Sequence, residues 1–368
     1  MQKPWFVLSP CGTSLLTNAA NDIERKLVSK YANHKSGNDI PAEETNRLSA
    51  LIERVRGQMA SADHSHAAKA SAELNAIIKL YQGEGSNPQH FHQLLCTDTW
   101  LGETTATLVA EWLRGKGFTA NVKRQTDLQT ADLQAFQLAL SDLVQWCHET
   151  LSAYQQNRYR IIFNLTGGFK SVQGFLQTLA MFYANEAVYI FETGRELLRI
   201  PRLPITMNAE GVVRDHLQTF RRLALGLEDT LITGIPETLL LQIADEITLS
   251  AWGSLVWEQA KRQLYAEGLH PSPSAKLRFG KQFEKDVVAL AKERCVIVNE
   301  RIDQLVRCLE KNGKYNPPSL NFKAIEGGDY KGSTHECDAW ADRDAKRIFG
   351  HFEGGVLVVD RIITSPFH

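Results

Sequence analysis

Asn-Leu-Thr-Gly-Gly-Phe-Lys-Ser, residues 164–171, is the stretch that decides the fold of the N-terminal half of the chain. The apolar run 159–163 before it predicts a buried strand, and residues 172–183 after it predict a helix. Two glycines at such a junction let the backbone approach a ligand closely. The free amides and the positive end of the helix dipole favour an anion, and Lys170 adds a positive charge. The segment predicts a phosphate-binding loop; an ordinary tight connection is the alternative.

Two other predicted strands also end in small polar residues where a helix begins. In a parallel α/β sheet such ends gather at the carboxyl edge of the strands, where ligands bind. Ordinary helix N-caps are the alternative interpretation. The predicted ligand residues are Ser9, Gly12, Thr13 and Ser14 after the first strand, Asp98, Thr99 and Gly102 after the second, and Gly167, Gly168, Phe169, Lys170 and Ser171 in the glycine loop.

Alternating strand and helix patterns fill the first 205 residues. Such alternation predicts an α/β fold, a Rossmann-like, doubly wound and mainly parallel sheet. Residues 21–84 interrupt it, and we expect a helical hairpin there with a loop at 60–66. Strands are expected at 4–9, 91–97, 119–125, 159–165 and 186–192, with a short partner at 196–200, and helices at 102–116, 130–154 and 170–184.

Proline pairs at 201/204 and 271/273 divide the rest of the chain. The boundaries predict three parts: 1–205, a helical linker or dimer layer at 206–275, and a final domain at 276–368. Residues 206–268 carry many large apolar groups, and Pro236 is expected to open a helix there. A helical section at 280–311, followed by strand patterns up to residue 363, predicts a small α+β domain. Residues 353–355 predict a hairpin turn.

The composition of the 368 residues is that of a soluble globular protein, with 43% hydrophobic and 23% charged residues. The net charge of −1 provides no general positive field for nucleic acid. Six scattered cysteines form no CxxC pair and are expected to be buried thiols in a reducing cytoplasm. No signal peptide and no membrane-spanning run is found, so we expect a cytoplasmic protein without a membrane partner.

Residues 1–205 resemble a CARF domain, the cyclic-oligoadenylate sensor of type III CRISPR systems. The segments that carry the resemblance are 164–171, 9–14 and 97–99, with Gly102 and Glu103. The resemblance implies a homodimer that binds one ring of linked adenylates across its two-fold axis, and a ring of repeated phosphates suits a site built twice from the same loops. It favours cyclic tetra-adenylate as the allosteric activator.

Residues 276–368 resemble the RelE family of ribosome-dependent mRNA interferases. The segments that carry this resemblance are 320–327, 345–352 and 354–362. It implies cleavage of ribosome-bound mRNA without a metal or cofactor: the 2′-hydroxyl attacks the adjacent phosphorus and leaves a 2′,3′-cyclic phosphate. The chain departs from the basic surface common in that family, because positive and negative residues are nearly balanced after residue 276.

Arg347 matches the arginine on the central strand of the RelE family and is the first candidate for stabilising phosphate charge. The other candidate catalytic residues are Arg343, Lys323, Lys346, His335, Arg361 and His368, with His351 as a further candidate for proton transfer. The alternative is a solvated network in which Arg343, Lys346 and Arg347 pair with nearby aspartates. His335 and Cys337 share a strand face but lack further spaced ligands, so no metal site is expected.

These patterns predict a cyclic-oligoadenylate-activated endoribonuclease in type III CRISPR antiviral defence. One alternative is a sensor or regulator whose last domain is a non-catalytic interaction module. Another is a metal-dependent nuclease fused to the same sensor. A secondary activity, hydrolysis of the ring itself, would draw on Thr13, Thr99 and Lys170, although none of them is an obvious base.

Overall fold

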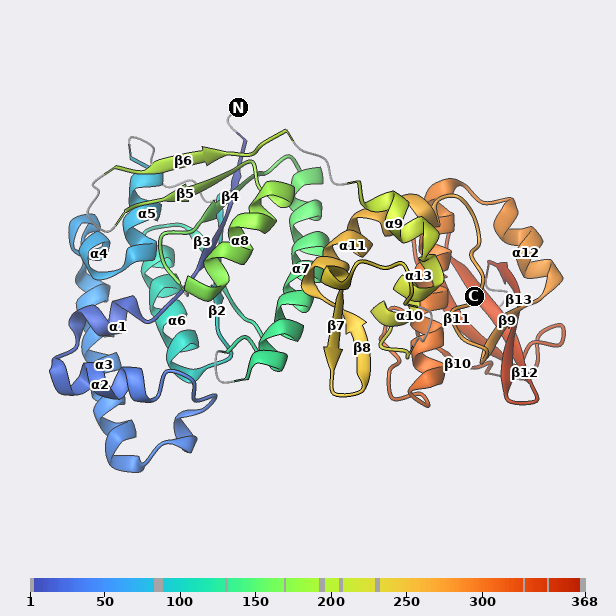
Figure 1. Ribbon diagram of the computed structural model, residues 1–368, viewed down its shortest axis with the longest axis horizontal. Coiled ribbons are helices and arrows are strands. Elements are labelled where there is room, and N and C mark those ends of the chain that lie inside the picture. Colours follow the sequence, from blue (N-terminus) through green and yellow to red (C-terminus); the bar gives the residue numbers. More distant parts are fainter. Residues whose placement is uncertain are drawn as a thin grey trace. The chain divides into compact units, whose positions relative to one another are not determined.

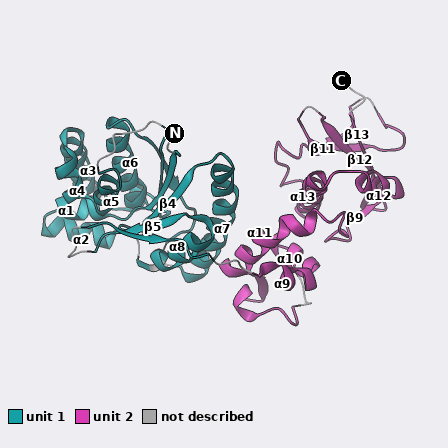
Figure 2. Ribbon diagram, turned by 90° about the horizontal axis from the view of Figure 1, so that it is seen from above, with its two compact units in different colours: residues 1–206 teal, residues 207–368 magenta. Residues whose placement is uncertain are grey.

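The computed structural model describes residues 3–82, 89–129, 132–168, 170–191, 196–204, 208–228, 232–326, 328–342 and 344–364. The chain forms two compact units, Met1–Thr206 and Met207–His368 (Figure 2). Each unit has its own sheet and its own hydrophobic core. In these ranges no helix has the length and apolar character needed to cross a bilayer.

The N-terminal unit is built on a six-stranded sheet in the order β3-β2-β1-β4-β5-β6 (Figure 1). All neighbours are parallel except β5 and β6. This is the strand order of a doubly wound Rossmann-type sheet, so the predicted fold class is confirmed for this unit. The strands are β1 (Trp5–Pro10), β2 (Phe91–Cys96), β3 (Thr119–Arg124), β4 (Arg160–Asn164), β5 (Glu186–Tyr189) and β6 (Leu198–Pro201).

Helices cover both faces of this sheet, which explains the continuous apolar runs in its central strands. Val7 packs into a core with helices α3 (Ala42–Ser61), α5 (Ala72–Leu80) and α6 (Trp100–Gly115). Phe6 points to the opposite face, where its ring centroid lies 4.4 Å from that of Tyr154 on α7 (Leu133–Gln156). Helix α8 (Lys170–Tyr183) lies beside α7 (Figure 1). All six cysteines are buried free thiols, as predicted.

The insertion after β1 is helical, but it is not the simple hairpin that we expected. It contains α1 (Ser14–Ala19), α2 (Asp22–Lys30), α3, α4 (His64–Ala70) and α5, with a short 3₁₀ turn η1 (Gly37–Asp39). The expected loop at 60–66 is wrong, because α4 begins within it. The Asp63 carboxylate accepts a hydrogen bond from the His66 amide and caps α4.

The first part of the second unit differs from the prediction of a wholly helical layer. It has α9 (Ala209–Asp215), α10 (Leu217–Ala224), η2 (Glu237–Leu239) and α11 (Ala251–Tyr265). Between η2 and α11 lies a hairpin of β7 (Leu240–Ile243) and β8 (Glu246–Leu249). The helix predicted from Pro236 is therefore only the short 3₁₀ turn η2, which Pro236 precedes, and it does not continue beyond Leu239. Ala244 turns the chain with φ of +53°, and the Leu and Ile side chains around it alternate with a strand period.

The last part of the chain is a small α+β domain with a five-stranded sheet in the order β10-β11-β12-β13-β9. The two glycines after Glu353 have positive φ and form the two-residue hairpin turn predicted at 353–355. Two features were not predicted. One is β9, which pairs in parallel with β13, and the other is the break that divides the predicted helical section 280–311 into α12 and α13. The elements are β9 (Leu277–Phe279), α12 (Lys281–Val288), α13 (Lys292–Glu310), β10 (Lys323–Ala324), β11 (His335–Trp340), β12 (Lys346–Glu353) and β13 (Val356–Ile363).

Candidate functional site

The loops after β1 and β4 meet at the point where the strand order of the N-terminal sheet reverses. From β1 the chain winds outward through β2 and β3, and from β4 it winds the other way through β5. A Cβ atom on Gly12 would lie 3.4 Å from the Gly168 Cα. Ligands of doubly wound sheets bind in the crevice at this switch point. Two of the three predicted ligand loops are therefore neighbours at the expected place.

Gly168 is a glycine for two separate reasons. Its φ is +93°, a conformation that other residues rarely adopt. A Cβ atom at this position would also come within 2.7 Å of the Pro10 Cβ. The glycine thus allows the β4–α8 loop to lie directly against the end of β1.

Glu73 of α5 lies between these two loops and is fully buried. Its Oε1 accepts a hydrogen bond from the Gly12 amide at 3.0 Å. Its Oε2 accepts from the hydroxyls of Ser14, at 3.0 Å, and Ser71, at 2.7 Å. A Cβ on Gly167 would overlap the same carboxylate. An amide and a hydroxyl predicted to bind phosphate are therefore occupied by the protein's own anion.

Asn164 and Gln173 hold the glycine loop in place from beneath. The Asn164 Nδ2 donates to the Ser9 hydroxyl at 3.2 Å and to the Glu73 carbonyl at 3.1 Å. The Gln173 Nε2 donates to the carbonyls of Leu165 and Gly167, at 3.2 and 3.0 Å. Ser9, a predicted ligand residue, is fully buried in this support and lies beneath the surface that a ligand would meet.

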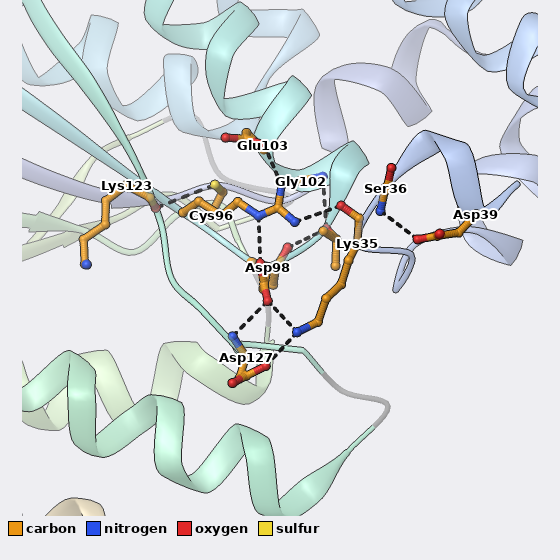
Figure 3. A network of polar contacts seen from close by, with 12 residues as sticks. Lys35, Ser36, Asp39, Cys96, Asp98, Gly102, Glu103, Lys123 and Asp127 are labelled. Atoms are coloured by element: carbon orange, nitrogen blue, oxygen red, sulfur yellow. Dashed lines mark hydrogen bonds and ion pairs between the residues drawn. The ribbon is translucent and has the colours of Figure 1, made fainter. Parts of the chain in front are cut away.

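The third predicted loop, after β2, is organised around Asp98 (Figure 3). Its carboxylate pairs with Lys35 and with Arg124, each at 2.8 Å, and accepts from the Asp127 amide at 3.1 Å. Burial would raise the pKa of Asp98, but these two cations and the amide together keep it below its usual value. Arg124 also pairs with Glu103 at 2.7 Å. Asp98 thus ties the inserted segment to the ends of β2 and β3.

Thr99 and Gly102 have structural roles at the start of α6. The Thr99 hydroxyl caps the helix by accepting from the Gly102 amide at 3.2 Å, and it lies 2.8 Å from the Thr97 hydroxyl. A Cβ on Gly102 would overlap the Thr97 hydroxyl and lie 2.8 Å from that of Thr99. The contacts of both residues are therefore those of an ordinary helix N-cap, the alternative interpretation given for this loop.

The remaining predicted ligand residues are more accessible. Thr13 is half-buried at the N-cap of α1 and makes no side-chain capping bond there. Lys170 is exposed at the first residue of α8. Phe169 lies outside the described residues, as does the side chain of Ser171. Thr13 and Lys170 are thus the described side chains best placed to meet an anion, while the Ser14 hydroxyl already donates to Glu73.

In the C-terminal unit, three of the predicted catalytic residues share one face of the sheet. Arg347 is paired in register with Asp338, Lys323 with Glu336, and Arg361 with Phe349. The opposite face packs on α12 and α13 through side chains such as Ile348 and Val359. Because side chains alternate along a strand, Arg347, Lys323 and Arg361 lie on the face turned away from these helices. We call this the open face; Phe349, at its centre, is nevertheless fully buried, with its ring centroid 5.4 Å from that of Tyr330.

His335 and Lys346 lie on the other side of the sheet. His335 pairs in register with Gly350, stacks on Phe322 at 5.4 Å, and meets Phe352 edge-on at 4.9 Å between centroids. Burial lowers the pKa of His335. The structure therefore separates these two candidates from Arg347. Arg343 and His368 lie outside the described residues.

Arg347 is held by carboxylates rather than left free. It forms an ion pair with Glu336, which is 4% exposed, and its Nε lies 3.3 Å from Asp338. Lys323 lies 4.0 Å from Glu336 and 3.4 Å from Glu326. Of the pairs with aspartate that the alternative to catalysis proposed, the described residues show Arg347 with Asp338; the other partners in this cluster are glutamates. Within the described ranges, no group of three or more His, Cys, Asp or Glu side chains has a geometry suited to a metal ion.

Comparison with known proteins supports a CRISPR association for the N-terminal unit. A family model described as CRISPR-associated protein (Cas_APE2256) matches residues 68–203, which include the glycine loop and the loop after β2. No curated protein matches the chain. The match agrees with the resemblance that the loops themselves carry.

One similar solved structure is Enterococcus italicus Csm6 bound to cyclic hexa-2′-fluoro-hexa-dAMP. It shares 10% sequence identity over 85% of this chain, with a TM-score of 0.30. The alignment covers 56% of that protein, so this chain spans little more than half its length. A TM-score this low does not establish a common fold, and the Rossmann assignment rests on the strand order.

Sequence reasoning did not find Glu73, Lys35, Arg124 or Gln173. Glu73 and Lys35 belong to the insertion, and no local pattern links them to the loops that they contact. Their roles depend on how the insertion folds back over the sheet. Gln173 was more accessible to prediction, because a side-chain amide one turn into the helix after a glycine loop can bond to the loop carbonyls.

Proposed function

We propose that the chain is a CRISPR-defence effector whose N-terminal unit binds a cyclic oligoadenylate, and that cyclic tetra-adenylate is its activator. The observation that carries the proposal is the meeting of the Gly12 and Gly168 loops at the switch point. The Gly168 loop lies inside the region, residues 68–203, that is similar to a CRISPR-associated family. Backbone amides, the hydroxyls of Thr13 and Ser14, and Lys170 suit phosphate oxygens. In a homodimer the same groups occur twice around a two-fold axis, as a cyclic ligand requires.

The C-terminal unit, in this proposal, is a RelE-type endoribonuclease that cuts ribosome-bound mRNA. The support is the sequence resemblance, the two helices ahead of the four antiparallel strands β10 to β13, and an open face that carries Arg347, Lys323 and Arg361. Such an enzyme aligns the 2′-hydroxyl with the phosphorus and stabilises the developing phosphate charge. Donors aimed at that charge contribute about 10²–10³-fold in rate.

Ring binding would act as the switch between an inactive and an active state. Moving an equilibrium from 1:99 to 99:1 requires a difference in binding of about 5.5 kcal/mol between the two states. Hydrogen bonds to charged groups contribute about 1.5–3 kcal/mol each, so a few phosphate contacts in each half of a dimer can supply it.

The test measures mRNA cleavage in a translation extract, with and without cyclic tetra-adenylate, and maps the cut sites against the ribosomal A site. The proposal expects ring-stimulated cuts in translated mRNA and none in the same RNA without ribosomes. Equal cleavage with and without ring would exclude allosteric control. Cleavage of naked RNA would exclude dependence on the ribosome.

Ligand binding is tested separately by calorimetry on Lys170→Ala. The charge of Lys170 is exposed at the glycine loop, so its loss should weaken ring binding by at least about tenfold. Lys26→Ala, which removes an exposed charge from α2, is the matched control and should bind like the parent. Equal affinities for both variants would remove Lys170 from the site.

Two carboxylates already pair with Arg347. This observation favours a second candidate function, a ring-binding sensor whose C-terminal unit is an interaction module. In that case the Glu336–Arg347–Asp338 cluster is purely structural. The two candidates separate in the extract: a module binds its partner but leaves every mRNA intact. Cleavage of the same RNA without ribosomes, dependent on an added divalent ion, would indicate the metal-dependent alternative. Incubation of labelled ring with the protein tests ring hydrolysis.

A further inference from the structure

We infer that His351 and Asp360 form a catalytic dyad on the open face of the C-terminal sheet. In it His351 is the general base that removes the proton from an RNA 2′-hydroxyl, and Asp360 positions it. This inference rests on the proposed ribonuclease function and adds a partly exposed imidazole as proton acceptor on the open face.

A β-bulge between β12 and β13 creates the dyad. Phe349 pairs with Arg361 and Gly350 with Val359, so Asp360 is the extra residue on β13. The Asp360 carboxylate lies 3.0 and 2.9 Å from the His351 Nδ1 and accepts a hydrogen bond from the Ser333 hydroxyl at 2.6 Å. Bulges of this kind often re-aim a side chain beside an active site.

The geometry leaves the other ring nitrogen of His351 available. With the Nδ1 hydrogen donated to Asp360, the Nε2 carries a lone pair, the form of imidazole that accepts a proton. Within the described ranges, every side-chain hydrogen bond of His351 uses Nδ1. The side chain is 34% exposed, so a substrate can reach it. The carboxylate that fixes the ring also stabilises the imidazolium that forms.

His351 also lies on the correct face. It pairs in register with Val358 and is two residues from Phe349 along β12, so it shares the open face with Arg361 and Arg347. Arg361 has fewer polar partners than Arg347 and no carboxylate among those of the described residues. Its guanidinium donates to the Lys331 carbonyl at 3.4 Å, and its buried Nε has no partner among the described residues. His335, by contrast, lies on the helix side between Phe322 and Phe352.

The reaction balances without a metal or an external oxidant. The 2′-oxygen forms a bond to phosphorus while its proton moves to the His351 Nε2, and the bond from phosphorus to the 5′-oxygen breaks. That oxygen takes a proton from water and leaves as a 5′-hydroxyl, and the other product is a 2′,3′-cyclic phosphate. Arg361 faces the phosphate oxygens during attack. His351 then returns its proton to solvent.

The experiment uses the full chain with cyclic tetra-adenylate and ribosomes that carry a short mRNA. His351→Ala should lower the cleavage rate by about 10²–10⁴-fold, and added imidazole should restore part of it. Asp360→Asn should lower the rate by a smaller factor, without a response to imidazole. His66→Ala is the matched control, since it breaks a His–Asp contact of similar length, 2.8 Å, on the surface of the other unit, and should cleave like the parent.

A second substrate tests whether His351 acts as a general base or as a general acid. With sulfur in place of the 5′-oxygen at the cut site, the leaving group departs without a proton donor. The defect of His351→Ala should persist on this mRNA if the residue is the base, and its disappearance would overturn that role. Thermal unfolding and ring affinity, measured in parallel, show that each variant is folded.

The possible failures are distinct. If the parent protein cuts no mRNA with any ring, the proposed function fails and the dyad fails with it. If the parent cuts and His351→Ala cuts equally fast, the dyad alone is wrong. A slow His351→Ala that imidazole does not rescue would also count against direct proton transfer.

Discussion

Glu73 in the N-terminal unit and Glu336 in the C-terminal unit are both buried carboxylates held against groups that were expected to bind phosphate. Their partners differ. Glu73 accepts hydrogen bonds from the neutral Gly12 amide and from the Ser14 and Ser71 hydroxyls. Glu336 forms an ion pair with Arg347, and its second oxygen has no partner among the described residues.

Because of this difference, we expect the contacts of Glu73 to be exchangeable and the ion pair of Glu336 to be fixed. Amides and hydroxyls that bind one anion can bind another, so a ligand phosphate can replace the Glu73 carboxylate if that side chain moves. Arg347 neutralises Glu336, and its withdrawal would leave a buried charge without compensation. The first carboxylate is therefore suited to a switch, and the second to the stability of the sheet. The predictions below test this contrast.

The largest effect is expected from Arg347→Ala, which should lower the free energy of unfolding by about 3–5 kcal/mol, because it leaves Glu336 buried and unpaired. Urea unfolding followed by tryptophan fluorescence measures it. Lys323→Ala is the control: Lys323 lies 4.0 Å from Glu336 and is more exposed, so we expect a loss of less than about 1 kcal/mol. Similar losses in the two variants would show that Glu336 does not depend on Arg347.

Loss of mRNA cleavage in Arg347→Ala is thus weak evidence for catalysis unless the stability of the variant is known. The double variant Glu336→Gln with Arg347→Ala resolves this, because it removes both charges together. If Arg347 is only structural, the double variant should regain both stability and activity. If it also contacts phosphate, stability should return and activity should not.

Gly167→Ala is expected to lower the free energy of unfolding by about 1–3 kcal/mol and to abolish ring binding. Its Cβ would overlap the Glu73 carboxylate, which three hydrogen bonds hold in place. Gly174→Ala is the matched control on α8, where a Cβ meets no atom within 4 Å. It should gain about 0.5–1 kcal/mol, because alanine loses less backbone entropy than glycine in a helix. A stable Gly167→Ala that binds ring would show that Glu73 moves easily.

The sequence identified the architecture of the N-terminal unit because its signals are local. The apolar run before residue 164, the two glycines and the helix behind them lie within 25 residues of each other. The hairpin of β7 and β8 was missed because three consecutive leucines, residues 239–241, obscure the strand alternation of the Leu and Ile side chains that follow. Its turn at Ala244 carries neither Gly nor Asn, the residues that announce a positive φ.

The sites were harder to foresee than the fold. Gly12 and Gly168 could be paired in advance, since the ends of parallel strands meet at one edge. Glu73 could not, because the position of α5 over those loops depends on the packing of the whole insertion. On the C-terminal sheet, the predicted strand pattern included Arg347, which lies in β12, but the bulge that brings Asp360 to His351 is a local irregularity with no sequence signal.

Mild acid should weaken the N-terminal unit through His92. Complete burial, with a smaller effect of His90, lowers the pKa of His92 from 6.5 to about 3. As the pH falls from 6.5 to 5, the unfolded chain takes up a proton that the folded chain does not. Stability is therefore full above pH 6.5 and decreases by up to about 2 kcal/mol at pH 5.

Urea unfolding at the two pH values measures this dependence. The variant His92→Gln should abolish it. The control His64→Gln, on the exposed side of α4, should retain it. In the C-terminal unit His335 is less completely buried, and burial lowers its pKa as well. We expect the N-terminal unit to be the more acid-sensitive of the two. A dependence unchanged in His92→Gln would mean that other groups set the acid limit.

The smallest effect is expected from Glu73→Gln, which tests whether this carboxylate competes with the ligand. Glutamine keeps an oxygen for the Gly12 amide but removes the negative charge beside the predicted phosphate site. Ring affinity should then rise by about tenfold, or 1.4 kcal/mol, in calorimetry. Glu53→Gln makes the same charge change on the exposed surface of α3 and should leave the affinity unchanged. A weaker affinity in Glu73→Gln would instead mean that the carboxylate accepts a hydrogen bond from the ring. Glu73 and Glu336 would then both be fixed parts of their sites, and the contrast between them would disappear.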